Sequence, residues 1–312
     1  MANQLTVIIP CKNEAHNIRA CIESVQGIAD EILVADSGST DDTLAVVRQI
    51  GNCRIVEREF IDHSNFKNWA IRQATQPWVL IVDADERVTT DLAAEIRGVL
   101  VGQPAFDAYR IRRQNYFLGH RIKRSGWNSA TVTRLFRRAV CRYDDKRVHE
   151  DVIVDTGKVK TLQAKFLHYT CQDLHQYLAR INRYTTWAAE DMHAAGRRTG
   201  YLGLLLRPPA RFLHFYILRG GFLDGAAGLA VCSTMAFYTF MKYAKLWALA
   251  RTTPADCATP ADCATPSDCA TPSDCATPAD CVRRGRLPAT ARARNQHPDR
   301  QATSTGATDK AA

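Results

Sequence analysis

Over roughly the first hundred residues the chain alternates between two hydrophobic patterns. Short, nearly continuous apolar runs such as "LTVIIP" and "WVLIV" are followed by segments whose apolar residues recur every three or four positions. The runs predict buried strands, and the segments between them predict amphipathic helices. We therefore predict strands and helices in alternation at residues 5–10, 14–28, 31–36, 39–51, 53–58, 65–75, 78–85 and 89–100. This β-α alternation indicates a parallel sheet covered by helices.

Polar side chains follow three of the predicted strands. They occupy residues 10–14 ("PCKNE"), 36–39 ("DSGS") and 83–85 ("DAD"). Ligands of open α/β sheets bind at the carboxyl ends of the strands. We therefore expect these three segments to converge on one polar site.

The segment "WVLIVDADERV" leads a buried strand directly into Asp83, Asp85 and Glu86. Paired carboxylates at such a position have three interpretations: a general acid/base pair, a site for a hard divalent cation, or a solvated turn that caps the next helix. Several arginines and lysines follow over the next fifty residues, Arg134 among them. Carboxylates that hold a metal among guanidinium groups have the composition needed to bind a diphosphate.

The rest of the chain divides into three kinds of sequence. Residues 105–168 contain short strand-like pieces, and residues 173–195 have a helical pattern. Residues 201–250 mix apolar, aromatic and arginine side chains and include an uncharged run at 225–241, at the lower limit for a membrane span. This run favours a helix that lies in the membrane interface, with a buried core helix and a true span as the alternatives.

The last sixty residues repeat the hexapeptide TPADCA, with small variations, five times over residues 253–281. A proline every six residues excludes helix and sheet interiors, and no apolar face recurs, so we predict a disordered tail. The predicted organisation is an α/β domain at 1–170, a helical membrane-associating region at 171–251 and the tail at 252–312.

The formal net charge of +9 lies entirely before the tail, because residues 252–312 hold seven basic and seven acidic residues. A basic body suggests a nucleic acid, an anionic lipid or a phosphorylated substrate as partner. The charge is spread along the chain without a nucleic-acid recognition motif, so we expect no nucleic acid. The amino terminus lacks the features of a secretory signal, and the six cysteines before the tail lack metal-site spacing, which favours reduced thiols inside the cell.

Several of these stretches together resemble family 2 glycosyltransferases of the GT-A fold. Four segments match the motifs of that family in order and spacing: "VIIPCKNEAHNI", "ILVADSGSTDDT", "FKNWAIRQA" and "WVLIVDADERV". Four later segments resemble the branch of the family that includes lipopolysaccharide inner-core β-1,4-glucosyltransferases: "GWNSATVTRLFRR", "RVHEDV", "FLHYT" and "RFLHFYILRGGFLDGAAG". The resemblance covers about residues 4–250. It implies an α/β fold with a mostly parallel sheet flanked by helices, and it implies that residues 1–170 are the nucleotide-sugar-binding and catalytic domain.

The resemblance also implies roles for residues at the strand ends. Pro10 and Glu14 would meet the nucleoside, Asp36 the uracil and Asp83 the ribose. Asp85 would hold Mg²⁺ or Mn²⁺ on the donor diphosphate. Asp83 and His149 are the further metal ligands expected, and the other residues expected at the nucleotide-sugar are Lys67, Asn68 and Arg134.

An acceptor hydroxyl needs a general base. The segment "RVHEDV" resembles the acceptor-side motif of this branch, which implies Glu150 as the base and Asp151 as the second candidate. Without the resemblance, residues 149–151 read as an exposed charged turn. We expect His168 to pack beneath the site without taking part in it.

These roles imply an inverting, metal-dependent hexosyltransferase. Its donor would be a UDP-hexose, with UDP-glucose favoured, and its acceptor a lipopolysaccharide core or a related lipid-linked saccharide. It would work in the cytoplasm, bound peripherally to the anionic inner face of the cell membrane. Two alternatives stay open: transfer to polyprenyl phosphate, and a non-catalytic nucleotide-sugar-binding module. The presence of Asp83, Asp85 and Glu150 argues against the module.

Overall fold

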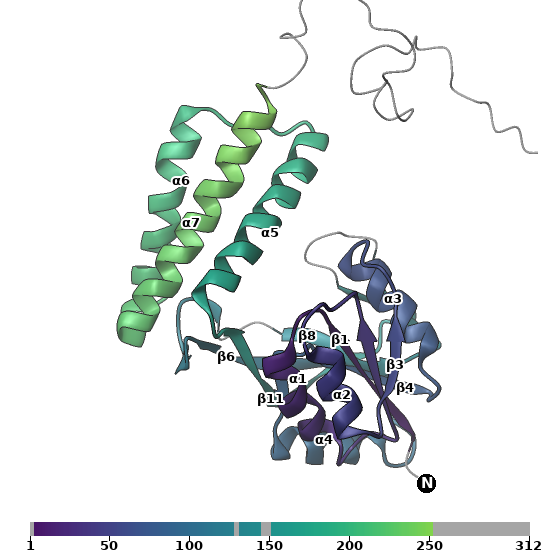
Figure 1. The fold of residues 1–312 in the computed structure, drawn as a ribbon. Coiled ribbons are helices and arrows are strands. Elements are labelled where there is room, and N and C mark those ends of the chain that lie inside the picture. The colour runs from purple at the N-terminus through teal and green to yellow at the C-terminus, as the bar shows by residue number, and fades with distance from the viewer. Residues whose placement is uncertain (1–2, 128–130, 145–150, 252–312) are drawn as a thin grey trace, which may run out of the picture. The chain divides into compact units, whose positions relative to one another are not determined.

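The predicted β-α alternation is present in the structure, a computed structural model that describes residues 3–127, 131–144 and 151–251 (Figure 1). Four strands pair in parallel in the order β3-β2-β1-β4. These strands are β1 (Leu5–Cys11), β2 (Glu31–Asp36), β3 (Arg54–Glu57) and β4 (Trp78–Ile81). The first four helices are α1 (Ala15–Val25), α2 (Thr43–Ile50), α3 (His63–Gln73) and α4 (Thr90–Leu100).

Beyond β4 the sheet continues in the order β8-β6-β11-β5, and β7 pairs with β6. These strands are β5 (Glu86–Val88), β6 (Ala108–Phe117), β7 (His120–Arg121), β8 (Thr131–Arg137) and β11 (Val159–Cys171). Strand β8 is antiparallel to both β4 and β6. The sheet is therefore more mixed than expected. The described residues of the connection from β6 to β8 contain no α-helix, and such a connection suits antiparallel neighbours.

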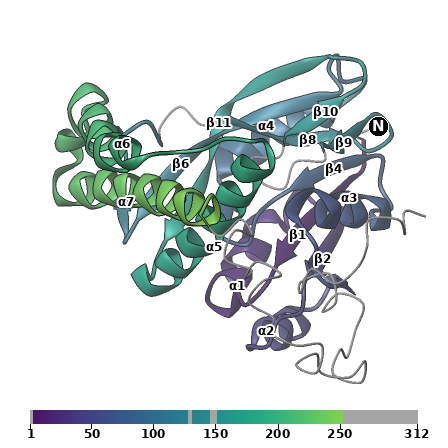
Figure 2. The same ribbon diagram turned by 90° about the horizontal axis from the view of Figure 1, so that it is seen from above.

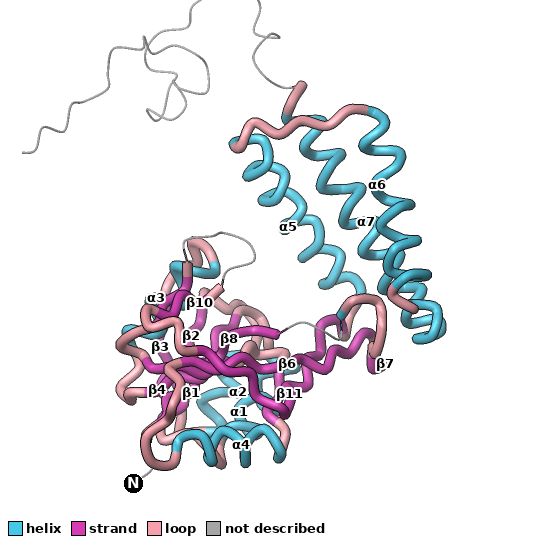
Figure 3. Tube along the Cα trace, turned by 180° about the vertical axis from the view of Figure 1, so that it is seen from behind, coloured by secondary structure: helices cyan, strands magenta, loops and turns pink. Residues whose placement is uncertain are grey.

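Both faces of the sheet are buried, as the continuous apolar strands indicate. Val7 and Leu80 point to the face that also buries Ile18 of α1 and Ile96 of α4. Their sequence neighbours, such as Ile8, point to the other face. That second face packs against Phe66, Ala70 and Ile71 of α3 and against the small β9–β10 pair, Cys141–Tyr143 and Val152–Val154. Figure 3 shows α1, α2 and α4 together on one side of the strands.

The carboxyl-terminal part of the described chain is helical. It contains α5 (Leu174–Ala194), α6 (Tyr201–Leu213), the π-helical turn η2 (His214–Leu218), the short helix η3 (Gly221–Asp224) and α7 (Gly225–Leu249). The helix predicted at 173–195 is thus confirmed. Helix α7 packs against both α5 and α6 (Figure 2).

Among the described helices, none alone has both the length and the apolar composition of a membrane span. The segments Tyr201–Leu218 and Gly221–Leu249 satisfy that test only as a pair, bent by 71° at the break between them. The predicted tail, residues 252–312 with its hexapeptide repeats, lies outside the described residues.

Candidate active site

The polar ends of β1, β2 and β4 lie side by side, as the sequence predicts. The parallel register places Cys11 opposite Asp36, and Val82 follows β4 with a hydrogen bond from its amide to the carbonyl of Ile8 in β1. Pro10, one residue before the end of β1, lies opposite Ala35 of β2. The three segments predicted to converge share one edge of the sheet.

Asp36 holds the loop that follows β2. Its carboxylate is fully buried, and it accepts hydrogen bonds from the amides of Gly38 and Ser39 at 2.8 Å each and from the hydroxyl of Ser39 at 2.5 Å. These contacts fix the loop in which a nucleoside would lie. The direct contact between Asp36 and a uracil stays a prediction.

Asp83 is surrounded by three cationic side chains. Lys67 Nζ of α3 lies 3.8 Å from Oδ1, Arg113 Nη2 of β6 lies 3.1 Å from Oδ2, and Arg134 of β8 donates to the same Oδ2. Burial alone would raise the pKa of Asp83, but Arg134, Lys67 and Arg113 outweigh it and hold this pKa well below its usual range. The sequence predicted two of these partners, Lys67 and Arg134, at the site. A direct bond from Asp83 to a metal stays a prediction.

Arg113 also neutralises a second carboxylate. Its Nε donates to Glu86 Oε1 at 2.6 Å, and the Glu86 side chain has no exposed surface. The other oxygen of Glu86 accepts from the backbone amide of Asp83 at 3.1 Å. Arg113 thus joins the two acids and fixes the turn between β4 and β5. Arg113 is one of the several basic residues that follow Asp83 in the sequence, where nothing distinguished it from the others. The apolar–polar alternation along residues 107–117 is the signal that indicates which arginines share a face of β6.

Asp85 faces His168, which we had expected to lie beneath the site. His168 Nε2 is 3.4 Å from Asp85 Oδ2, and Arg180 Nη1 is 3.9 Å from the same oxygen. Burial alone would raise the pKa of Asp85, and His168 outweighs it with help from Arg180, so this pKa is lowered. The segment "FLHYT", which contains His168, is the feature of the sequence that could have indicated this contact.

The orientation of His168 can be derived from its other nitrogen. Asn115 Nδ2 donates to the backbone oxygen of Trp127 at 2.6 Å, so Asn115 Oδ1 is the atom that faces His168 Nδ1 at 2.7 Å. Nδ1 must then carry the proton. Nε2 therefore donates to Asp85 when the imidazole is protonated, which is the form that lowers the pKa of Asp85, and offers a lone pair to a cation when the imidazole is neutral. An oxygen and a nitrogen donor thus face each other, which is a donor set suited to a divalent metal ion.

A cavity of about 450 Å³ opens beside Asp85. Its wall includes Lys12 and Glu14 from the end of β1, Tyr169 from β11 and Arg180 from α5. The pKa of Glu14 is raised to about 7 by burial and by the nearby Asp85, against a hydrogen bond from Asn17. Glu14, expected at the nucleoside, therefore shares a cavity with Asp85.

Asn68 uses its side chain to fasten β9 to α3. Its Nδ2 donates to the carbonyl of Tyr143 at 3.0 Å, and its Oδ1 accepts from the amide of Tyr143 at 2.8 Å. The Tyr143 hydroxyl accepts from Arg134 at 2.8 Å, and Lys67 Nζ lies 5.1 Å from the centre of the Tyr143 ring. Asn68 thus supports the cations around Asp83, and its contact with a nucleotide stays a prediction.

The acceptor-side residues are only partly described. Asp151 is exposed at the start of β10, and its carboxylate accepts from the amide of Val152 at 2.8 Å. Glu150 and His149 lie outside the described residues. Their roles as base and metal ligand stay predictions.

Known proteins share this sequence pattern. The family model for glycosyl transferase family 2 matches residues 6–157. LpsC, a lipopolysaccharide core biosynthesis glycosyltransferase of Rhizobium meliloti, is 29% identical over 248 residues, which cover 78% of this chain and 92% of LpsC. An uncharacterised glycosyltransferase of Rickettsia prowazekii is 26% identical over 253 residues, covering 78% of this chain and 86% of its own. A solved mannosyltransferase from Pyrobaculum calidifontis, in complex with GDP-Man and Mn²⁺, is 18% identical; the match has a TM-score of 0.46 and covers 79% of this chain and 87% of that protein.

The matched family region contains all three polar strand ends and the cations around Asp83. The similarity to LpsC extends over nearly its whole length, so it is not confined to a shared short motif. The family match over residues 6–157 and the similarity to LpsC support a family 2 glycosyltransferase.

Proposed function

We propose that this chain transfers a hexose, with UDP-glucose as the donor, to a lipopolysaccharide core or a related lipid-linked saccharide, with inversion at the anomeric carbon. The observation that carries the proposal is the charge arrangement at the strand ends. Buried cations hold Asp83, and Asp85 faces His168 and Arg180 at the wall of a cavity. The similarity to LpsC supports the choice of acceptor.

The cavity offers cations to a diphosphate. When a nucleoside diphosphate leaves the sugar, negative charge builds on the oxygen that joined them, and positive side chains held in place stabilise it. Arg180 lines the cavity with its side chain one-third exposed, and Lys12 lines the same wall. These two side chains would bind the phosphates, while Lys67, Arg113 and Arg134 keep Asp83 ionised and oriented.

The residues at Asp85 fit a divalent cation. Within the described residues no group of three or more histidine, cysteine, aspartate or glutamate side chains is arranged to hold a metal. Mg²⁺ needs only one or two protein carboxylates when substrate phosphates complete its coordination, and Mn²⁺ also accepts imidazole. Asp85 and His168 would hold the ion, which would supply positive charge to the diphosphate.

The acceptor hydroxyl must lose a proton as it attacks. We assign this role to Glu150, with Asp151 as the second candidate, from the resemblance of "RVHEDV" to the acceptor-side motif. A single displacement with one base inverts the configuration, so an α-linked donor gives a β-linked product.

The proposal includes peripheral binding to the cytoplasmic face of the membrane. Apolar side chains on α6, η2 and η3 are more than half exposed, which is unusual for a surface that stays in water. They include Tyr201, Leu202, Leu206, Leu218 and Phe222. Arg207, Arg211 and Arg219 on the same segment suit lipid phosphates, at about 1 kcal/mol each near an anionic surface.

Vesicle flotation tests the membrane proposal. The wild type should float with anionic vesicles at low salt, and a triple alanine variant of Arg207, Arg211 and Arg219 should float less. Equal flotation of the two proteins would exclude the electrostatic contribution. Resistance of the wild type to extraction at alkaline pH would instead indicate a span.

Activity is tested with purified protein, a panel of nucleotide-sugars and Mn²⁺ or Mg²⁺. We expect slow hydrolysis of UDP-glucose without an acceptor, and faster turnover with truncated lipopolysaccharide than with polyprenyl phosphate. Preference for polyprenyl phosphate would overturn the acceptor assignment. Binding of UDP-glucose with no hydrolysis or transfer under any condition would favour the non-catalytic module.

A further inference from the structure

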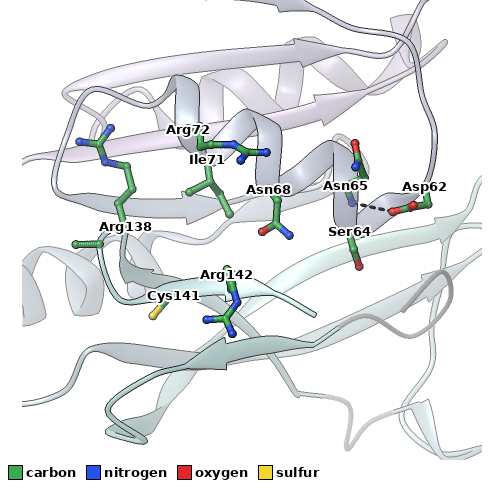
Figure 4. A pocket seen from close by; sticks show the side chains of 10 residues that line it. Asp62, Ser64, Asn65, Asn68, Ile71, Arg72, Arg138, Cys141 and Arg142 are labelled. Carbon is green, nitrogen blue, oxygen red and sulfur yellow. Dashed lines mark hydrogen bonds between the residues drawn. The ribbon is translucent and has the colours of Figure 1, made fainter. Parts of the chain in front are cut away.

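A second, larger cavity of about 640 Å³ lies between α3 and the segment that runs from the end of β8 through β9 (Figure 4). Its wall combines side-chain amides and guanidinium groups. They come from Asn65, Asn68 and Arg72 of α3 and from Arg138 and Arg142 opposite. We call this cavity the α3 groove. It is distinct from the cavity at Asp85, with which it shares no lining residue.

One wall of the groove is the polar face of the amphipathic helix α3. Phe66 and Ala70 point into the core, whereas Asn65, Asn68 and Arg72 are spaced three and four residues apart and share another face. From Asp62 to Arg72 this face extends about 15 Å. Figure 4 shows these α3 residues in a row along the helix, with Arg142 on the strand that faces them.

The charge of the α3 groove is positive. Its wall holds three arginines and one carboxylate, Asp62, which caps α3 and accepts from the amide of Asn65 at 2.7 Å. Arg142 is paired with Asp155 at 2.9 Å, so the uncompensated charge comes from Arg72 and Arg138. Arg138 is anchored by a hydrogen bond to the carbonyl of Ala74 at the end of α3. Arg72 has no ion pair with any residue that the structure describes, so its charge is available to a ligand.

The α3 groove is connected to the candidate active site through one residue. Asn68, in the groove wall, holds the backbone of Tyr143 by two hydrogen bonds, and the hydroxyl of Tyr143 accepts from Arg134 at 2.8 Å. Arg134 in turn donates to Asp83. Helix α3 itself presents Lys67 to Asp83 and Asn68 to the groove. The groove therefore runs along the same helix that borders the site.

We propose that the α3 groove binds anionic groups of the acceptor saccharide, phosphate or carboxylate, at sugars other than the one that receives the hexose. This inference rests on the proposed glycosyl transfer. Guanidinium groups match phosphate and carboxylate oxygens in pairs, and side-chain amides of the Asn65 and Asn68 type suit sugar hydroxyls. The groove would select acceptors by the charge they carry at a distance from the reacting hydroxyl.

The test compares two charge reversals that are alike in their helical position. Arg72→Glu changes the groove, and Arg48→Glu is the matched control, because Arg48 is an exposed basic residue in the last turn of α2. Each of the two variants loses the favourable interaction between a basic side chain and the carboxyl end of its helix. Arg72→Gln removes the charge without reversing it, and remains informative if Arg72→Glu folds poorly.

The acceptors are truncated lipopolysaccharide as isolated, the same material after removal of its phosphates, and the same material after reduction of its carboxylates. With the untreated acceptor we expect Arg72→Glu to raise the KM for the acceptor about tenfold and Arg72→Gln to raise it less. The KM for UDP-glucose should stay as in the wild type, and Arg48→Glu should match the wild type throughout. The treatment that cancels the difference identifies the anion that is bound.

Two results would overturn the proposal. One is an unchanged acceptor KM in both Arg72 variants; the other is an increase of the same size with the untreated acceptor and with material lacking both phosphates and carboxylates. If the wild type neither hydrolyses nor transfers any sugar, the proposed function fails by itself. Calorimetric titration of untreated and doubly treated lipopolysaccharide into wild type and Arg72→Glu then decides on the groove, since only an anion-dependent loss of binding supports it.

Discussion

Replacing Arg113 with methionine should leave a buried carboxylate without its cation. Arg113 is the ion-pair partner of Glu86, at 2.6 Å, and Glu86 has no exposed surface. Asp83, the other acid that Arg113 contacts, keeps Lys67 and Arg134. The cost of the change should therefore arise mainly at Glu86.

The size of the effect can be worked from this geometry. Removing one partner of a buried ion pair costs about 3–5 kcal/mol of unfolding free energy. Glu86 keeps one hydrogen bond, from the amide of Asp83, so we expect the lower end of that range, about 3 kcal/mol. For a protein of this size that corresponds to a decrease in Tm of roughly 6–12 °C.

The assay is a double-mutant cycle followed by thermal and urea unfolding. Arg113→Met and Glu86→Gln are combined, because the neutral amide no longer needs a cation, and the double variant should be more stable than Arg113→Met alone. Arg112→Met is the control: it removes a half-buried arginine next in sequence, for which the structure gives no ion pair among the described residues, and it should change stability by less than about 0.5 kcal/mol. Additive losses in the double variant would refute the reasoning, as would equal losses in Arg112→Met and Arg113→Met.

Four further predictions concern single residues. Asp85→Asn should abolish UDP-glucose hydrolysis at limiting Mn²⁺ while leaving the fold intact by circular dichroism; normal activity there would contradict the metal assignment. Glu150→Gln should abolish sugar transfer while the Kd for UDP-glucose, measured by calorimetry, stays unchanged. If Glu150→Gln is active, Asp151 becomes the candidate for the general base. The pKa of Glu31 is lowered to about 2, because hydrogen bonds from threonine and arginine side chains outweigh the opposing effect of burial. Its ionised form therefore stabilises the fold above about pH 4.5, and this contribution is lost as the pH falls toward 2. Glu31→Gln should cost roughly 1–2 kcal/mol in urea unfolding at pH 7 and progressively less below pH 4.5; a difference that does not change with pH would contradict this account. Gly228→Ala should cost about 1–3 kcal/mol or more, since a Cβ there would lie 1.9 Å from the carbonyl oxygen of Gly221, and an unchanged Tm would show that η3 can move away.

The sequence by itself determined the elements of the amino-terminal half and the place of the site. Hydrophobic periodicity is a local property, so strands and helices could be predicted one segment at a time. Parallel strands bring their carboxyl ends to one edge, which was enough to group the polar residues that follow β1, β2 and β4. The family motifs are local as well, and they identified Asp83, Asp85, Lys67 and Arg134 before any contact was known.

Only the tertiary structure decided which side chains meet. Arg113 and Arg134 reach Asp83 from strands 30 and 51 residues away in sequence, and His168 reaches Asp85 from β11. Such contacts depend on strand order and register, and a slip of one residue would turn each of these side chains to the opposite face. Neither the insertion of β8 antiparallel to β4 nor the α3 groove has a local signature, because each is formed by segments that the sequence keeps far apart. The physical reason is that periodicity fixes which face of an element is buried, whereas pairing between distant elements fixes what that face contacts.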